Sequence, residues 1–297
     1  MDAFAGIGSP AALAAQLATT GYLADEAVST IGFLALQMQR PFLIEGEPGT
    51  GKTAFATAVA EVLSLPLIRL QCYEGIDASQ ALYDWDFPRQ VLHLRALQIS
   101  SDLTSADVAE AERSMFQEGF LLARPILRAL RESPAVLLID EIDRADDEFE
   151  ALLLEVLSTY QVSIPELGTI GAVTPPVVIL TSNRTREIHD ALKRRCLYHW
   201  IEHPDLAREL DIVRTRAPEV SAELAEQVVG LVQQLRHEGE LVKPPGVSET
   251  LDWARALARL GTTTIDIQVA SATVGAVVKY REDAQRVRTA LSRLLHA

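Results

Sequence analysis

The stretch that decides the fold is Gly46-Glu47-Pro48-Gly49-Thr50-Gly51-Lys52-Thr53. It matches the pattern G-x-x-x-x-G-K-[ST] in full, which is typical of a loop whose backbone N–H groups surround a phosphate. The apolar run 42–44 precedes the loop and predicts a buried strand, and residues 53–63 have helical periodicity. A strand, a glycine-rich loop and a helix in this order predict a binding site for a nucleoside phosphate.

Each residue type in this loop has a physical role. Gly46, Gly49 and Gly51 let the backbone turn so that its N–H groups converge at the N-terminus of the next helix, where the helix dipole favours anions. Lys52 brings a compact positive charge to the β- and γ-phosphates, and the Thr53 hydroxyl is a ligand for Mg²⁺. The loop therefore predicts binding of a nucleoside triphosphate together with Mg²⁺.

A second motif, Val136-Leu137-Leu138-Ile139-Asp140-Glu141, is an apolar run that ends in two acids. In open α/β sheets, ligands bind at the carboxyl ends of the strands. Asp140 is expected to hold Mg²⁺ through its water shell, and Glu141 is expected to act as a general base on water. The alternative is a strand that leads into a helix N-terminus, which acidic residues favour. Paired with the phosphate loop, the motif favours hydrolysis.

Polar residues also follow the apolar run 177–180. Asn183 can orient a water molecule against the γ-phosphate, or it can be a turn residue. The basic cluster Lys193, Arg194 and Arg195 comes ten to twelve residues later. Its arginines can reach a neighbouring subunit's γ-phosphate as an arginine finger, or they can lie at a solvated helix end.

The order of the elements predicts the fold class. Apolar, β-branched runs at 42–44, 67–71, 135–139, 177–180 and 197–201 alternate with helical patterns, which predicts a five-stranded parallel sheet between layers of helices. After His203-Pro204 the patterns at 205–216, 221–237, 247–260 and 265–295 are all helical. We expect an α/β nucleotide-binding domain over residues 1–204 and a small helical domain over 205–297.

Composition excludes several classes of protein. The chain has 297 residues, with 27 Lys and Arg against 41 Asp and Glu and a net charge of −14, which argues against a protein that coats nucleic acid or an anionic membrane. Its two cysteines, Cys72 and Cys196, exclude a disulfide scaffold. No run approaches the ~20 apolar residues of a membrane span, and no basic residue precedes Arg40. A cytoplasmic protein is expected.

Taken together, these motifs resemble those of the AAA+ ATPases, and more closely those of the MoxR family, in the type associated with maturation of carbon monoxide dehydrogenase. The resemblance extends from about Gly21 to Leu260. Besides the common motifs, it is carried by three stretches: Gly21-Tyr22-Leu23-Ala24-Asp25, Asp140-Glu141-Ile142-Asp143-Arg144-Ala145 and His189-Asp190-Ala191-Leu192-Lys193-Arg194-Arg195-Cys196.

The resemblance implies that the protein binds ATP and Mg²⁺. Tyr22, Leu23 and Ala24 lie where AAA+ proteins pack the adenine, Asn183 corresponds to sensor 1, and Thr53 and Asp140 are the implied metal contacts. The implied nucleotide contacts are Tyr22, Leu23, Gly46, Glu47, Pro48, Gly49, Thr50, Gly51, Lys52, Thr53 and Phe55. The implied catalytic residues are Lys52, Glu141, Asn183, Arg194 and Arg195, with either arginine as the finger.

The implied partners are other proteins. Such ATPases are similar in forming rings, usually hexamers, with the active site between subunits. The family further implies a partner with a von Willebrand factor A domain and a client metalloenzyme that needs assembly, cofactor insertion or activation.

Two insertions fit the same family. One spans about 74–100 and contains Tyr83-Asp84-Trp85-Asp86-Phe87, in which aromatic and acidic residues alternate. It is either a partner-contact surface or an aromatic anchor that packs the insert onto its own domain. The other, at about 161–173, resembles the hairpin inserted before sensor 1.

The C-terminal region departs from the AAA+ pattern. The expected sensor-2 arginine is missing, because Glu249 or Thr250 occupies its place, while Lys243 and Arg255 lie nearby.

Two other functions remain open. A DNA-acting AAA+ motor would need basic residues along its inserts, whereas residues 74–95 carry more acids than arginines. A non-catalytic nucleotide switch is disfavoured by the intact Asp140-Glu141 pair. A metal site at His199 and His203 is disfavoured against a structural role, because residues four apart do not converge on a strand end.

Overall fold

The computed structural model describes residues 6–100, 114–238 and 241–295. Its central feature is a five-stranded sheet in the order β2-β5-β8-β1-β9. The strands are β1 (Phe42–Gly46), β2 (Leu67–Gln71), β5 (Val136–Asp140), β8 (Val177–Ser182) and β9 (Leu197–Ile201). β5 pairs in parallel with β2 and with β8. The sheet confirms the predicted fold class.

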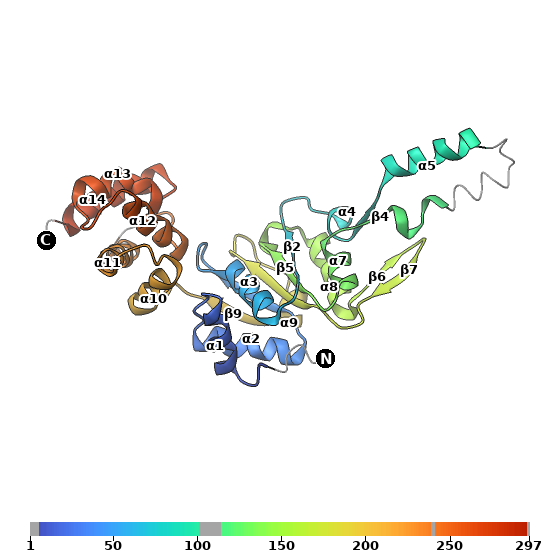
Figure 1. Cartoon of the computed structure of the whole chain (residues 1–297), viewed down its shortest axis with the longest axis horizontal. Helices are drawn as coiled ribbons and strands as arrows, with labels where there is room; N and C mark the ends of the chain where they lie inside the picture. Colours follow the sequence, from blue (N-terminus) through green and yellow to red (C-terminus); the bar gives the residue numbers. More distant parts are fainter. Residues whose placement is uncertain (1–5, 101–113, 239–240, 296–297) are drawn as a thin grey trace. The chain divides into compact units, whose positions relative to one another are not determined.

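The helices of the N-terminal two thirds alternate with these strands (Figure 1). They are α1 (Pro10–Thr19), α2 (Glu26–Met38), α3 (Lys52–Leu63), α4 (Ala78–Ala81), α5 (Phe87–Ser100), α7 (Pro125–Arg131), α8 (Asp147–Thr159) and α9 (Asp190–Arg195), with short 3₁₀ turns η1 (Glu118–Phe120) and η2 (Ile142–Arg144). Sheet strands that are covered on both faces become continuously apolar, and every residue of β5 is buried.

Contacts divide the chain into two compact units. The first consists of residues 31–44 and 59–198, and the second of residues 7–30, 45–58 and 199–297, apart from the residues outside the described ranges. These units combine separate stretches of the chain. The boundary expected at residue 204 between two consecutive domains stays a prediction.

The core of the first unit lies between the sheet and its helices. Helix α7 packs on β2 and β5 (Figure 1). Leu127, Leu137 and Leu153 are almost completely buried in this core. Two small antiparallel pairs adjoin this core: β3 (Tyr83–Trp85) with β4 (Leu121–Ala123), and β6 (Gln161–Ile164) with β7 (Gly168–Gly171).

The aromatic-acidic stretch is divided between two elements. Tyr83 and Trp85 lie on β3, half-buried, and pack against the core of the first unit. Phe87 instead begins α5 and is 59% exposed. The first two aromatic residues therefore anchor the insert, and the alternation ends at Trp85 because the backbone becomes helical.

The C-terminal helices have a core of their own within the second unit. They are α10 (Leu206–Arg216), α11 (Ala222–Glu238), α12 (Val247–Arg259), α13 (Ile267–Val277) and α14 (Arg281–Leu294), and they pack on one another around Trp253 and Val287 (Figure 1).

The prediction of a continuous helical segment over 265–295 is wrong in one respect. Val278 and Tyr280 have extended backbone conformations, so the segment is two helices, α13 and α14. The break lets α13 pack on α12 while α14 packs back on α11, and Val278 is buried at the corner. The apolar surface that both halves bury stabilises the fold more than a continuous helix would, and local periodicity does not encode this burial.

No helix in the part of the chain that the structure describes is long and apolar enough to cross a membrane.

The central strand β8 provides a test of the packing. Val178 on β8 is 2% exposed, whereas Val173 in the loop before it is 98% exposed. Val178→Ala removes two buried carbon atoms and leaves a cavity, so we expect the free energy of unfolding to fall by about 2 kcal/mol. Val173→Ala should leave it unchanged in the same urea titration. Equal effects of the two substitutions would contradict the assignment of β8 to the core.

Candidate functional site

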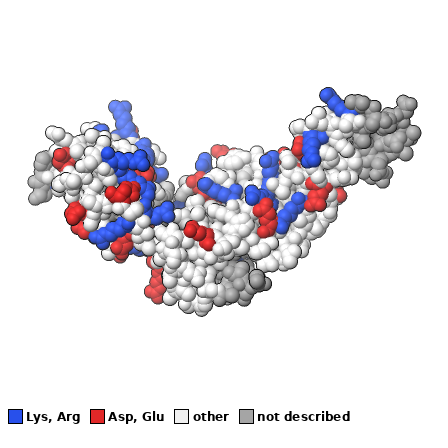
Figure 2. Space-filling model, in the orientation of Figure 1, with Lys and Arg blue, Asp and Glu red and all other residues white. Residues whose placement is uncertain are grey.

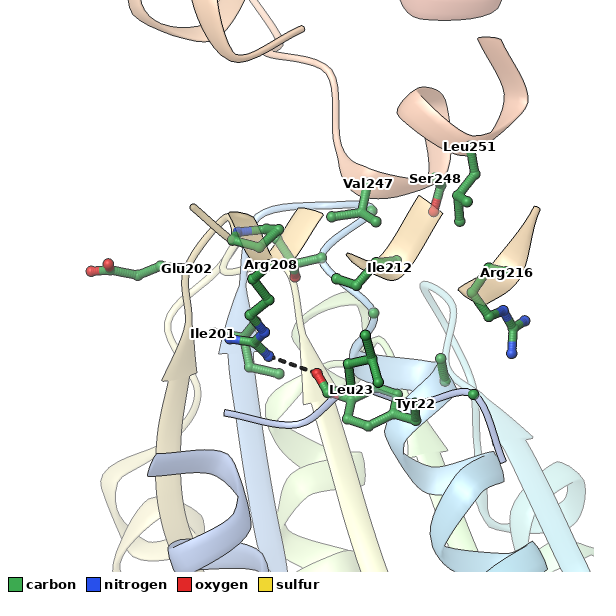
Figure 3. A pocket seen from close by; sticks show the side chains of 16 residues that line it. Tyr22, Leu23, Ile201, Glu202, Arg208, Ile212, Arg216, Val247, Ser248 and Leu251 are labelled. Atoms are coloured by element: carbon green, nitrogen blue, oxygen red, sulfur yellow. Dashed lines mark hydrogen bonds between the residues drawn. The ribbon is translucent and has the colours of Figure 1, made fainter. Parts of the chain in front are cut away.

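A pocket in the second unit joins four segments of the chain (Figure 3). The segment between α1 and α2 contributes Tyr22 and Leu23, and the phosphate loop contributes Gly49, Thr50 and Gly51. Helices α10 and α12 supply the opposite side, with Arg208, Ile212, Arg216, Val247, Ser248 and Leu251. The structure thus brings two of the three predicted base-packing residues, Tyr22 and Leu23, and part of the predicted phosphate loop to one cavity, whereas Ala24 does not line it.

The Tyr22–Leu23 side of the pocket is held by one arginine. Arg208 donates from Nη2 to the Leu23 carbonyl oxygen at 3.0 Å and from Nη1 to Asp25 Oδ2 at 2.6 Å (Figure 3). Burial opposes ionisation of Asp25, but the Val28 N–H and Arg208 outweigh it and hold the pKa of Asp25 below its ordinary value. The Asp25 carboxylate therefore stays charged and keeps Arg208 in place.

The aromatic rings of this side form a small apolar surface. Tyr22 contacts Phe55 edge to face, with ring centroids 5.6 Å apart, and Phe55 is 1% exposed. Burial raises the pKa of Tyr22, with Arg208 offsetting part of the effect, so the phenol stays neutral. Phe55 supports Tyr22 from beneath and is not among the residues that line the cavity. The surface suits a flat, uncharged ring.

Hydrogen bonds within the phosphate loop hold its backbone in place. Lys52 is 6% exposed, and its Nζ donates to the carbonyl oxygens of Gly46 and Glu47 at 2.8 and 2.7 Å. The Thr50 hydroxyl also donates to Glu47. A Cβ at Gly46 would lie 2.4 Å from the carbonyl oxygen of Ile201, so only glycine fits there. These contacts hold the loop at the N-terminus of α3, where the helix dipole favours anions.

A second set of polar residues lies in the first unit, at the carboxyl ends of β5 and β8. Asp140 is 2% exposed and pairs with Arg69 at 2.6 Å. The Thr181 hydroxyl donates to Asp140 Oδ1 at 2.5 Å and accepts from the Glu141 N–H at 2.9 Å. Burial, and then the Asp140 charge, raise the pKa of the neighbouring Cys72 to about 12, so this thiol stays protonated.

Glu141 is the most constrained of these residues. Its backbone is left-handed, with φ 56° and ψ 51°, which is uncommon outside glycine. Its carboxylate accepts from Gln71 at 3.1 Å, from Asn183 at 3.4 Å and from Arg144 at 3.1 Å. The structure therefore brings together the predicted base and the predicted water-orienting amide.

Two further acids at this edge are structural. Asp143 is 2% exposed and accepts the backbone N–H groups of Asn183 and Thr185, and Glu150 is 1% exposed and accepts from Arg186 and the His189 N–H. Both fix the loops that follow β8. Among the residues that the structure describes, no group of three or more His, Cys, Asp or Glu is arranged to hold a metal ion.

The two candidate finger residues end α9 and are exposed to solvent. Arg40 caps this helix, because its guanidinium donates to the carbonyl oxygens of Arg194 at 2.8 Å and Arg195 at 3.2 Å. Sequence reasoning did not select Arg40, which lies more than 150 residues away. Neither arginine contributes to the pocket in Figure 3.

The cationic residues that the C-terminal helices place at the pocket are not Lys243 and Arg255, the two named in the sequence analysis. Arg255 pairs with Glu219 at 3.3 Å, Lys243 is exposed, and neither residue lines the pocket. The pocket instead receives Arg208 and Arg216, which lie with Ile212 on α10 at intervals of four residues. This spacing places all three on one helix face and is the signal that could have identified them.

Comparisons with known proteins identify the family of the chain. A profile of the ATPase family associated with various cellular activities (AAA) matches residues 42–202, more than half of the chain. The denitrification regulatory protein NirQ of Stutzerimonas stutzeri is 27% identical over 210 residues, 68% of this chain and 66% of that protein. The gas vesicle ATPase GvpN of Haloferax mediterranei is 26% identical over 68% of this chain and 58% of its own length.

Among solved structures, a RuvB variant of Thermotoga maritima aligns with 86% of this chain and 70% of its own, at 17% identity and a TM-score of 0.49.

His203, at the start of the C-terminal region, makes the free energy of unfolding of the second unit depend on pH. Burial, aided by Arg236, lowers the pKa of His203 below its ordinary 6.5. The unfolded chain then binds a proton that the folded chain does not, so the free energy of unfolding should decrease as pH falls below about 6.5. His203→Gln should flatten this decrease between about pH 7 and 5.5, whereas substitution of the exposed His237 by Gln should not. Melting temperatures that fall equally in both variants would refute the prediction.

Proposed function

The chain belongs to the AAA family of ATPases, and we propose that it is a Mg²⁺-dependent ATP hydrolase of the MoxR type that remodels a client protein. The observation that carries the proposal is the position of Glu141, next to the buried Asp140 and in contact with Asn183. This arrangement offers a carboxylate base and a neutral amide at the carboxyl edge of a parallel sheet, where α/β proteins bind ligands.

The reaction divides among residues of this chain. Lys52 and the loop N–H groups bind the phosphates, and Tyr22, supported by Phe55, packs on the base. Asn183 orients water, and Glu141 takes its proton as the water oxygen attacks the γ-phosphorus and the bond to ADP breaks. The contacts from Gln71 and Arg144 keep the Glu141 carboxylate at the end of β5 before the reaction.

The residues available for Mg²⁺ fit that ion. Mg²⁺ prefers oxygen ligands and keeps several waters, so a hydroxyl and one carboxylate suffice beside the phosphates. Thr53 follows the loop lysine, and Asp140 is a buried carboxylate oriented by Thr181 and Arg69. When bound, the ion neutralises charge on the phosphates.

The work done by hydrolysis is proposed from the family. A MoxR-type protein forms a ring, usually a hexamer, and acts with a von Willebrand factor A domain partner on a metalloenzyme that needs assembly, cofactor insertion or activation. NirQ, to which this chain is similar, is a denitrification regulatory protein, and this likeness supports a role that acts on another protein. A cytoplasmic location and the domain division at residue 204 belong to the same proposal.

A DNA-acting motor is less well supported. On the face shown in Figure 2, Lys and Arg are mixed with Asp and Glu, whereas nucleic-acid tracking requires a continuous basic surface. In the insert, Arg89 donates to the Gly119 carbonyl oxygen, and Asp84 pairs with Arg124 from outside the insert.

The base assignment can be tested by a conservative substitution. Glu141→Gln keeps the size and removes the charge, so turnover should fall at least 100-fold while ATP still binds. The matched control is Glu148→Gln, because Glu148 is an exposed acid on α8. We would measure phosphate release and ATP affinity for both variants. Wild-type turnover in Glu141→Gln would exclude the assignment.

The finger assignment predicts complementation between subunits. An Arg194→Ala or Arg195→Ala subunit lacks the finger but keeps its base, and a Glu141→Gln subunit keeps the finger. Whichever arginine is the finger, its variant should lose at least 100-fold in turnover and regain activity when mixed with Glu141→Gln subunits. The exposed Arg293→Ala serves as control and should behave as wild type. If neither arginine variant is impaired, the finger lies elsewhere.

A further inference from the structure

The turn that leads into the first residues of α12, residues 245–248, touches the phosphate loop backbone to backbone. A Cβ added at Gly246 would lie 2.7 Å from the Pro48 carbonyl oxygen and 2.8 Å from the Gly49 Cα. A Cβ added at Gly49 would lie 3.1 Å from the Gly246 Cα, and the Ser248 N–H points to the Gly49 carbonyl oxygen at 3.4 Å. All of these residues belong to the second unit. Two glycines are therefore required where these segments meet.

The turn is held from behind by a buried ionic network. Arg236 on α11 donates from Nε to the Pro245 carbonyl oxygen at 2.6 Å. Its two terminal nitrogens pair with both oxygens of Glu209 on α10, at 2.6 and 2.7 Å, and Thr250 on α12 donates to Glu209 at 2.6 Å. The side chains of Glu209 and Arg236 are 0% and 6% exposed. A pair so completely buried is geometrically specific, because neither charge can be left alone.

The same helix holds the other side of the pocket. Arg208, adjacent in sequence to Glu209, binds the Leu23 carbonyl oxygen and Asp25. Helix α10 therefore connects the Tyr22–Leu23 segment with the turn that touches Gly49. The residues that α12 contributes to the pocket, Val247, Ser248 and Leu251, carry no charge.

We propose that the 245–248 turn couples the C-terminal helices to bound nucleotide through the Gly246–Gly49 backbone contact, which takes the place of an arginine on α12. Gly246 and Thr250 are positioning residues in this proposal. A nucleotide that fixes the phosphate loop then also fixes the turn and α12. The inference rests on the proposed nucleotide binding.

The proposal can be tested by adding a single methyl group at Gly246. Gly246 has φ −82° and ψ 179°, which alanine adopts without strain, so Gly246→Ala affects only the close approach. The new Cβ meets backbone atoms that cannot rotate away, and the turn must separate from the loop. Gly275→Ala is the matched control, because Gly275 lies in α13 with nothing within 4 Å of an added Cβ.

Two quantities are measured with ADP as the probe: affinity, by fluorescence of a labelled ADP, and hydrogen exchange of the α12 amides with and without ADP. Wild type and Gly275→Ala should bind ADP and show slower exchange in α12 when it is bound. Gly246→Ala should bind about tenfold more weakly, equivalent to ~1.4 kcal/mol, and should lose the response of α12.

A second variant leaves the glycines intact. Thr250→Val removes the hydroxyl that donates to Glu209 and should weaken the α12 response in the same direction, with the exposed Thr289→Val as its control. If wild type binds ADP and both Gly246→Ala and Thr250→Val keep its affinity and exchange response, the coupling is refuted. If wild type itself does not bind ADP, the proposed function fails first.

Discussion

The central strands β5 and β8 are buried along almost their whole length, so their polar side chains are confined to the strand ends. Asp140, Glu141 and Asn183 all occur at this edge because a charge further back would be desolvated without compensation. The Thr181 hydroxyl links the two strand ends by donating to Asp140 and accepting from Glu141. The chemistry of the first unit therefore depends on where a buried parallel sheet ends.

Much of this could be predicted from the sequence, because the informative signals are local. The apolar runs placed all five sheet strands, and the phosphate loop lies where its pattern indicates, between β1 and α3. The paired acids follow a strand for the same reason. Glu141 and Asn183 meet because neighbouring parallel strands end at a common edge.

The residues that sequence reasoning missed act across long separations. Arg40 caps α9 from more than 150 residues away, Gln71 reaches Glu141 from the end of β2, and Arg208 reaches Leu23 from 185 residues away. The spacing of Arg208 with Ile212 and Arg216 marks one helix face, but no local pattern names the partner of any of these side chains, because each contact exists only after the chain has folded. The break at Val278 was missed for the same reason, since it depends on burial against other helices.

Arg208 and Glu209 are consecutive residues of α10, so their side chains leave the helix about 100° apart. One is tied to the segment between α1 and α2, and the other to α11 and α12. A helix of 11 residues is stiff at this length, so α10 cannot rotate about its own axis without disturbing both sets of bonds. Helix α10 therefore joins the segment between α1 and α2 to the buried pair that holds α11 and α12.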